Sequence, residues 1–257
     1  MNKYLKNLNR LEFFITTACT GRCKHCSEGE HASGGGHIDG DTAANAVREL
    51  CGEFEITSLM TFGGEPLLYP DVVCKIHAVA RDMGIPKRQL ITNGFFGKNA
   101  DTIRRTAADI AENGVNDILL SVDAFHQETI PLDTVRLFAE AVKAEGIGIR
   151  VHPAWLVSRE DYNPYNIRTR EILSEFDEMD FDCSDGNIIF PSGNALKYLG
   201  EYFPDGAEQK SPYEEDPEDI RAISVSPNGD VLNGNLYKNH ILDIIESYSP
   251  AESLKIS

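Results

Sequence analysis

The sequence has no long hydrophobic run. No segment approaches the roughly 18–20 consecutive apolar residues that a membrane-spanning helix needs. The N-terminus, MNKYLKNLNR, contains basic residues, but no apolar segment of the kind found in a secretion signal follows them. We therefore expect a cytoplasmic protein that has no membrane partner.

Positive charge is scarce as well. The 257 residues include 24 Lys and Arg against 41 Asp and Glu, which gives a net charge of −17. A protein that binds nucleic acid needs a basic stripe to neutralise phosphates, and the sequence contains none. We therefore expect no nucleic-acid partner, and the acidity favours solubility.

Cysteine is absent after position 183, and the six cysteines are unevenly spread. Without a secretion signal, disulfide bonds are not expected. Three of the six lie in the segment CTGRCKHC. Such a cluster is typical of a metal or iron–sulfur site in a reducing compartment. The six are Cys19, Cys23, Cys26, Cys51, Cys74 and Cys183.

Strand-like and helix-like segments alternate over residues 1–190, which predicts parallel βαβ units. The fold class we expect is α/β, a partial (β/α)6 TIM-like barrel. The first helix would start behind Asp39 or Asp41, either of which can cap it. In such barrels the chemistry lies at the C-terminal ends of the strands. Strands are expected at 11–17, 57–62, 89–92, 117–122, 147–151 and 187–190.

Residues 191–257 differ in composition and are expected to form a small C-terminal extension. It would begin with an acidic linker at 204–220, rich in acid, proline and glycine. Residues 222–232 predict a β-hairpin with Asn228-Gly229 at its turn, and a short helix is expected at 242–248.

The three clustered thiols suit an iron–sulfur cluster, because thiolates are its usual ligands and three of them leave one iron of a cubane open. A structural zinc site is the alternative, with His25 or His31 as the fourth ligand. A third interpretation is three unrelated buried cysteines. Spacing alone leaves all three open.

Two motifs together resemble the radical S-adenosylmethionine (SAM) superfamily. They are Cys-x3-Cys-x2-Cys after the first strand and GGEP at 63–66 after the second. The resemblance covers residues 10–190 and implies that Cys19, Cys23 and Cys26 hold a [4Fe–4S] cluster whose fourth iron SAM chelates. It further implies reductive cleavage of SAM to a 5′-deoxyadenosyl radical that abstracts hydrogen from a substrate. One departure is His25, which stands where the family usually carries an aromatic residue.

The resemblance also implies a SAM site. Gly63 and Gly64 would let the backbone approach the methionine ammonium group, with Glu65 and Pro66 completing the turn. Four further residues would contact SAM: Asn93 near the ribose, Ser121 and Asp123 after the fourth strand, and Arg150 at the carboxylate. The glycines and Asn93 also fit ordinary turns, Asp123 a helix cap, and Arg150 a surface ion pair.

Catalytic candidates follow from side-chain chemistry. His126 and His152 are candidates for proton transfer, although a lone histidine is more often structural. Cys183 is a candidate hydrogen-atom donor, although it precedes the expected sixth strand and so would lie toward the opposite end of the barrel. The segment VHPAWLVSREDYNPYN, which contains Trp155 and Asn163, either binds a polar substrate or caps and packs a helix.

The extension resembles the SPASM/twitch domain of radical SAM enzymes that mature peptides, through FPSGNA at 190–195 and SPNGDVLNG at 226–234. It has no cysteine, and Asn233 stands where a cluster ligand is expected, so we predict no auxiliary cluster. The resemblance favours peptide or protein modification, with a reductant such as flavodoxin or ferredoxin. The alternatives are a small-metabolite substrate, which the short N-terminus favours, a glycyl-radical activating enzyme, and a zinc-stabilised non-catalytic binding protein.

Overall fold

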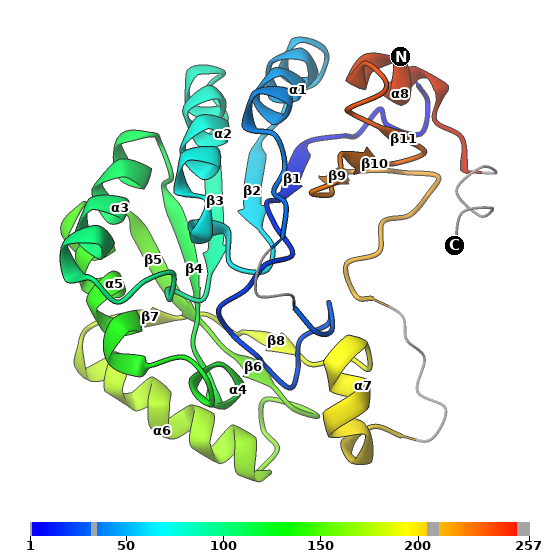
Figure 1. Cartoon of the computed structure of the whole chain (residues 1–257). Helices are drawn as coiled ribbons and strands as arrows, with labels where there is room; N and C mark the ends of the chain where they lie inside the picture. The colour runs from blue at the N-terminus through cyan, green and yellow to red at the C-terminus, as the bar shows by residue number, and fades with distance from the viewer. Residues whose placement is uncertain (1, 32–34, 205–210, 251–257) are drawn as a thin grey trace.

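A computed structural model describes residues 2–31, 35–204 and 211–250. Its centre is a seven-stranded sheet in the order β7-β5-β4-β3-β2-β1-β9, in which every neighbouring pair is parallel. The strands β7 and β9 are its two edges, so the barrel is partial (Figure 1). The strands are β1 (Arg10–Phe14), β2 (Ser58–Phe62), β3 (Lys87–Thr92), β4 (Asp117–Ser121), β5 (Gly148–His152), β7 (Asp182–Cys183) and β9 (Ala222–Val225).

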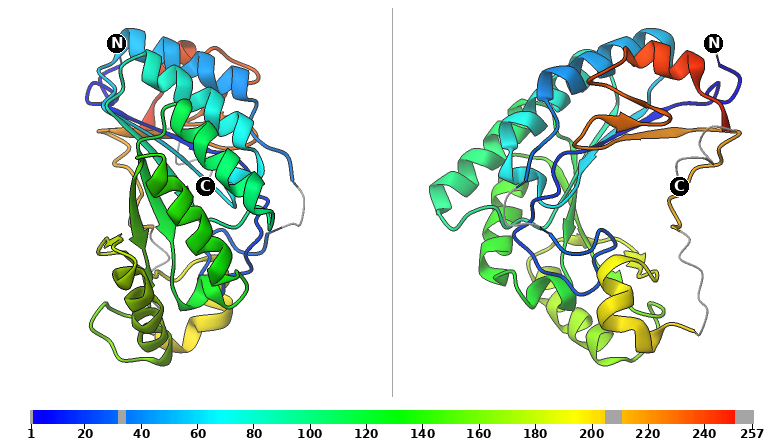
Figure 2. Two further views of the ribbon diagram at one scale, coloured as in Figure 1. Left: turned by 90° about the vertical axis from the view of Figure 1, so that its left-hand side faces the viewer. Right: turned by 45° about the vertical axis from the view of Figure 1, so that its right-hand side comes forward.

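Helices cover the convex face of the curved sheet, and the concave face looks away from them (Figure 2). The long ones are α1 (Gly40–Glu53), α2 (Pro70–Asp82), α3 (Ala100–Glu112), α5 (Leu132–Ala144) and α6 (Pro164–Glu178). Short helices occur in the loops and in the extension, and they are η1 (Pro66–Leu68), α4 (Ala124–Gln127), α7 (Gly193–Leu199), η2 (Gly200–Tyr202) and α8 (Ile241–Ser247). This arrangement confirms the predicted α/β partial barrel.

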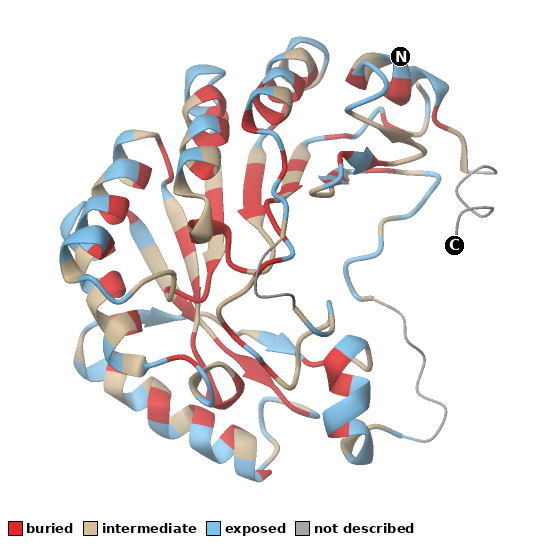
Figure 3. Ribbon diagram, viewed as in Figure 1, coloured by how far each residue is buried: buried red, intermediate tan, exposed pale blue. Residues whose placement is uncertain are grey.

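The main core lies between the strands and these helices (Figure 3). Because side chains alternate along a strand, Leu11 and Phe13 of β1 are buried against the helices while the residues between them face the concave side. The apolar stripe of α5 is buried in the same core, which fits its helical spacing. Asp39 caps α1 by accepting a hydrogen bond from the Thr42 amide, so Asp39 and not Asp41 starts that helix.

The sixth strand of the sheet is β7, whose two residues pair with Arg150 and Val151. The prediction of that strand at 187–190 is wrong. Residues Asn187–Ile188 form β8, which pairs with β6 (Ala154–Trp155) in a separate two-stranded sheet. A strand of two residues is too short to show the alternation of apolar and polar side chains, so the sequence pattern could not distinguish β7 from β8.

The extension contributes a strand to the main sheet. β9 pairs in parallel with β1, and the antiparallel pair is β10 (Asp230–Val231) with β11 (Gly234–Asn235). The turn predicted at Asn228-Gly229 is present, with Gly229 at φ 83°. The strands on its two sides, β9 and β10, belong to different sheets, so the hairpin predicted at 222–232 is wrong and the β10–β11 pair lies further along the chain. The boundary at residue 190 stays a prediction, and part of the predicted acidic linker, 205–210, lies outside the described residues. No helix in the described ranges is both long and apolar enough to span a membrane.

Candidate active site

The concave face carries its side chains in rows, because neighbouring strands are in fixed register. Phe14 pairs with Phe62, and Ile91 pairs with Leu119, as parts of one apolar row. These side chains and the loops beyond the C-terminal strand ends line a cavity of about 1040 Å³. The sequence-predicted residues that line it are Cys19, Cys23, His25, Cys26, His31, Gly63, Gly64, Asn93, Ser121, His126, Arg150 and His152.

The cysteine loop follows β1, and all three thiols line the cavity. A Cβ atom at Gly21 would lie 3.2 Å from the Cys23 Sγ and 3.7 Å from the Cys19 Sγ, so the glycine sits between two thiols with no room to spare. The Cys26 Sγ lies 3.1 Å from His31 Nε2, and His31 Nδ1 lies 2.8 Å from the Thr17 carbonyl oxygen. His31, one of the two candidate zinc ligands, thus contacts the third thiol.

Burial raises the pKa of all three thiols. The pKa of Cys19 is raised to about 11, and those of Cys23 and Cys26 also lie above the ordinary value. The negative charge of neighbouring groups raises the pKa of each of these three thiols further. For Cys23 these groups include Asp123 and both other cysteines. Thiols in this environment remain protonated at neutral pH until a metal displaces the proton. Three sulfur donors on one short loop facing one cavity fit an iron–sulfur cluster with one open iron.

The GGEP turn packs directly against the start of the cysteine loop. The Gly64 amide donates to the Thr16 carbonyl at 2.7 Å, and the Glu65 amide donates to the Ala18 carbonyl at 2.8 Å. A Cβ at Gly64 would lie 2.1 Å from the Ala18 oxygen, and Gly63 has φ 141° with its Cβ position against Phe14. Only glycine allows this approach of two backbones.

Glu65 turns away from the cavity, and its carboxylate is fully buried. It accepts hydrogen bonds from the Leu67 amide (2.9 Å), the Thr92 hydroxyl (2.7 Å) and the Asn93 amide (2.9 Å). Burial raises the pKa of Glu65 to about 7, although these hydrogen bonds act in the opposite direction. Glu65 therefore joins the loop after β2 to the loop after β3.

Asn93 contacts the cysteine loop from the end of β3. Its Nδ2 lies 3.6 Å from the Cys19 Sγ and 3.3 Å from the Thr20 hydroxyl, and its Oδ1 accepts from the Phe95 amide at 2.8 Å. Asn93 is thus both a turn residue and a lining residue of the cavity. A contact between Asn93 and the SAM ribose stays a prediction.

Asp123 is a buried helix cap. Its Oδ1 accepts from the amides of Phe125 and His126, and its Oδ2 accepts from His126 Nδ1 (2.8 Å) and the Ala154 amide (3.0 Å). Burial alone would raise the pKa of Asp123, but the charge and hydrogen bonds of His126 outweigh it and lower the pKa. Because Nδ1 of His126 is held by this carboxylate, the orientation of its ring in the cavity is fixed.

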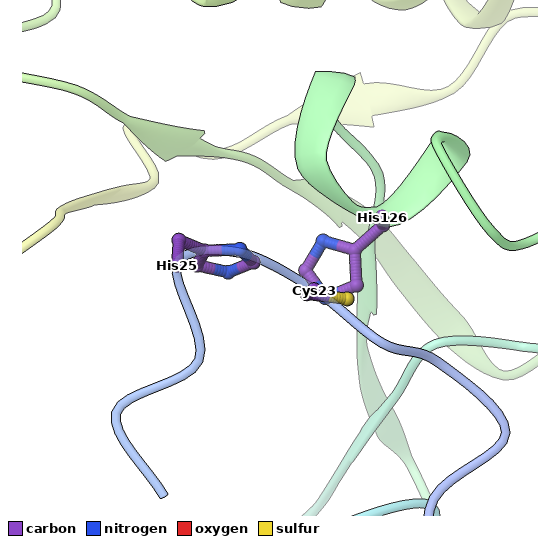
Figure 4. A group of neighbouring side chains, drawn as sticks. All are labelled: Cys23, His25 and His126. Atoms are coloured by element: carbon purple, nitrogen blue, oxygen red, sulfur yellow. The ribbon is translucent and has the colours of Figure 1, made fainter. Parts of the chain in front are cut away.

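His25 packs into this corner like an aromatic residue (Figure 4). Its ring lies 5.0 Å from that of Phe125 and 4.8 Å from that of His126, measured between centroids. The potential ligand atoms of Cys23, His25 and His126 all lie within 4.8 Å of one another. Burial lowers the pKa of His25 to about 4, so its ring is neutral at physiological pH and fills the aromatic position.

The remaining candidates divide between the two faces of the sheet. His152 lines the cavity, with Nδ1 2.7 Å from the Ser184 hydroxyl, and burial lowers its pKa. Cys183 lies in β7 and not before the sixth strand, so its predicted place at the opposite end is wrong. Cys183 pairs in register with Val151 of β5, whose side chain is buried. Cys183 itself is exposed and does not line the cavity.

Arg150 has a partner within the chain. Its guanidinium donates to both carboxylate oxygens of Asp117 at 3.0 Å on the concave face, where Arg150 also lines the cavity. Its predicted contact with the SAM carboxylate stays a prediction. Asn163 caps α6, and the fully buried Asn166 of α6 accepts from the Leu156 amide at 2.9 Å. These contacts match the helix-capping and packing role of this segment.

The sequence did not identify Asn194 of α7 as a site residue. Its side chain donates to the Cys23 carbonyl at 3.1 Å, from far along the chain. The segment FPSGNA, which contains Asn194, does not indicate this contact, because the contact exists only once α7 has packed on the cysteine loop.

A family model, the Radical SAM superfamily, matches residues 13–146, more than half of the chain. The chain therefore belongs to this superfamily of enzymes, which use a [4Fe–4S] cluster and SAM. The GTP 3′,8-cyclase of Desulforamulus reducens is 24% identical over 131 residues, 50% of this chain and 38% of that protein. The chain thus spans well under half the length of this curated relative.

Two solved structures share the fold. Streptococcus suis SuiB bound to S-adenosylmethionine superposes with a TM-score of 0.60 at 12% identity, over 99% of this chain and 69% of SuiB. Native anSMEcpe with bound AdoMet and Cp18Cys peptide gives a TM-score of 0.60 at 14% identity, over 96% of this chain and 82% of anSMEcpe. Both superpositions cover nearly the whole chain, so the partial barrel and the extension together share the fold of these two proteins.

Proposed function

We propose that this enzyme holds one [4Fe–4S] cluster on Cys19, Cys23 and Cys26 and uses SAM to abstract hydrogen from its substrate. The observation that carries the proposal is the meeting of three thiols with the GGEP turn at one cavity. When bound and reduced, the cluster would supply one electron for homolytic cleavage of a carbon–sulfur bond of SAM, which would yield methionine and a 5′-deoxyadenosyl radical.

The residues of the chain prepare the cavity for that chemistry. Gly63 and Gly64 line the cavity and would present bare backbone to the methionine ammonium group, and Asn93 and Ser121 would present polar groups to the rest of SAM. The apolar row through Phe14 and its neighbours excludes water from the region where hydrogen is abstracted. Asp123 holds His126 in a fixed orientation, which suits proton transfer.

We propose that the substrate is a peptide or a protein. Aromatic and aliphatic side chains line part of the cavity: the ring centroids of Phe190 and Tyr213 lie 6.4 Å apart, and Ile188 is 48% exposed. Such a surface suits the side chains of an extended peptide. The solved complex of anSMEcpe with a peptide supports the same assignment. We further place the enzyme in the cytoplasm, with flavodoxin or ferredoxin as reductant.

A small-metabolite substrate is the second candidate. The curated relative from Desulforamulus reducens is named a GTP 3′,8-cyclase. The inner face carries two ion pairs, Arg10 with Glu12 and Arg150 with Asp117, that suit a polar molecule. To separate the two, deuterium-labelled peptides and labelled GTP are offered in turn. The substrate is the one whose deuterium appears in 5′-deoxyadenosine.

The class-defining experiment is anaerobic reconstitution followed by reduction, addition of SAM and detection of 5′-deoxyadenosine. About four irons per chain are expected, as one cubane requires. Cys19→Ala should lose iron and turnover, whereas Cys51→Ala, on the helix α1, should keep both. Zinc without deoxyadenosine would point to the structural zinc site, and full turnover by Cys19→Ala would refute the assignment of the ligands.

A further inference from the structure

Two backbone carbonyls of the cysteine loop each accept two hydrogen bonds, one from the loop itself and one from Asn194. The Cys23 oxygen accepts from the Cys26 amide (3.3 Å) and from Asn194 Nδ2 (3.1 Å). The Cys26 oxygen accepts from the Gly29 amide (3.2 Å) and from the Asn194 amide (2.9 Å). Asn194 is only 7% exposed, and its backbone amide and its Nδ2 group each donate to one of these carbonyls.

The neighbours of Asn194 bring the same two segments together. The Ser192 hydroxyl donates to the Ser27 carbonyl at 3.2 Å, and Lys197 pairs with Glu30. Gly193 has φ 51°, and a Cβ there would lie 2.3 Å from the Ser27 oxygen. The approach of α7 to the loop therefore requires glycine at this position.

We propose that Asn194 is a positioning residue that sets the backbone of the cysteine loop for cluster binding. The inference rests on the proposed function, in which Cys23 and Cys26 ligate the cluster. The part of this loop around the thiols has no helix or strand of its own, so its geometry depends on outside contacts. Residues that support metal ligands without touching the metal typically contribute 10–100-fold to metal affinity.

The position also links the extension to the chemistry of the barrel. Asn194 lies beyond residue 190, in α7, which the figure shows beside the cysteine loop (Figure 1). The segment FPSGNA is thereby given a role other than holding auxiliary clusters: its Ser192, Gly193 and Asn194 all contact the loop that carries the proposed cluster ligands.

The test is the isosteric change Asn194→Asp, which replaces the Nδ2 donor by an oxygen that faces the Cys23 carbonyl. Asn194 is the second residue of α7, where an acidic side chain stabilises a helix, so α7 itself is not weakened. Asn45→Asp, the same change on the exposed face of α1, is the matched control. If circular dichroism shows that Asn194→Asp does not fold, Asn194→Ala replaces it in the test, because alanine keeps the backbone amide donor.

Two readouts are expected to move. Anaerobically reconstituted Asn194→Asp should release iron to a ferrous chelator about 10-fold faster than wild type or Asn45→Asp. In the cluster-free proteins, amide hydrogen exchange at Cys26 and Gly29 should be faster in the Asn194 variant. Unchanged iron release together with unchanged exchange would overturn the proposal. If the wild-type protein binds no iron and amide exchange is still faster in the Asn194 variant, Asn194 does position the loop. The proposed cluster is refuted in that case.

Discussion

The Oε2 atom of Glu65 accepts a hydrogen bond from the backbone amide of Asn93 at 2.9 Å. This contact joins the loops after β2 and β3, the first of which forms the GGEP turn and the second of which reaches the cysteine loop. The acidic residue of GGEP therefore acts on the backbone of the site and not on the cavity. Its carboxylate stabilises the relative position of two segments that must both face SAM in the proposed function.

Glu65→Gln is expected to lower the free energy of unfolding by about 2–3 kcal/mol at pH 5, because an amide group cannot accept all three hydrogen bonds. The folded-state pKa of Glu65, raised to about 7, lies above the ordinary value of about 4.3, so its contribution to stability is complete below about pH 4.3 and is lost as the pH rises to about 7. The deficit of the variant relative to wild type should therefore shrink at pH 8. Urea unfolding of the wild type and the variant at both pH values measures this deficit.

The control for this change is Glu55→Gln, at an exposed position before β2. It should alter the free energy of unfolding by less than about 0.5 kcal/mol at either pH. A Glu65→Gln deficit that grows from pH 5 to pH 8 would contradict the raised pKa of the buried carboxyl.

Gly64→Ala is expected to disrupt the site, because the new methyl group would lie 2.1 Å from the Ala18 carbonyl oxygen. Both atoms are bound to the backbone, so relief requires movement of the loop that leads into Cys19. We expect a loss of about 3 kcal/mol in the free energy of unfolding and loss of SAM binding, measured by calorimetry.

The same substitution at Gly52 is the matched control. Gly52 lies in α1, where a Cβ meets nothing within 4 Å, and alanine there should stabilise the helix by up to about 1 kcal/mol. Equal effects of the two substitutions would show that the close approach at Gly64 does not constrain the turn.

How far the sequence predicts this molecule depends on how local each feature is. The cysteine spacing, the GGEP turn and the Asp39 cap depend on neighbouring residues, and each is readable from a short segment. The pairing of Arg10 with Ala222 is different, because nothing in either segment specifies a partner so far along the chain.

The same limit applies to the site. The candidate SAM contact Asp123 proves to be held by four donors, one of which, the Ala154 amide, comes from β6. Asn194, whose segment FPSGNA does not indicate this contact, meets the cysteine loop only through the packing of α7. Local chemistry thus predicted which residues gather at the cavity, and tertiary contacts decided which of them face it.

Asp123→Asn is expected to lower the free energy of unfolding by about 2–4 kcal/mol. The carboxylate accepts four hydrogen bonds, and an amide NH2 in place of Oδ2 would oppose the donors of His126 or Ala154. Asp39→Asn, at the exposed cap of α1, is the matched control and should cost less than about 0.5 kcal/mol, because asparagine caps a helix about as well as aspartate. Thermal and urea unfolding compare the two, and equal losses would contradict the network around Asp123.

His77 supplies the last prediction. Its ring is fully buried between α2 and the sheet, with Nε2 2.9 Å from the Thr61 hydroxyl. Burial lowers the pKa of His77 to about 3, whereas an unfolded histidine titrates near 6.5. Its contribution to stability is therefore complete above pH 6.5 and is lost as the pH falls toward 3, at up to about 1.4 kcal/mol per pH unit.

His77→Gln should reduce this acid-dependent loss between pH 6.5 and pH 5, whatever its effect at neutral pH, because glutamine does not take up a proton. The same change at the exposed His240 should leave the loss in place. Urea unfolding of the cluster-free proteins at half-unit pH steps gives the slopes. If the slope of His77→Gln equals that of wild type, the buried ring does not titrate on unfolding, and the acid sensitivity of the chain originates elsewhere.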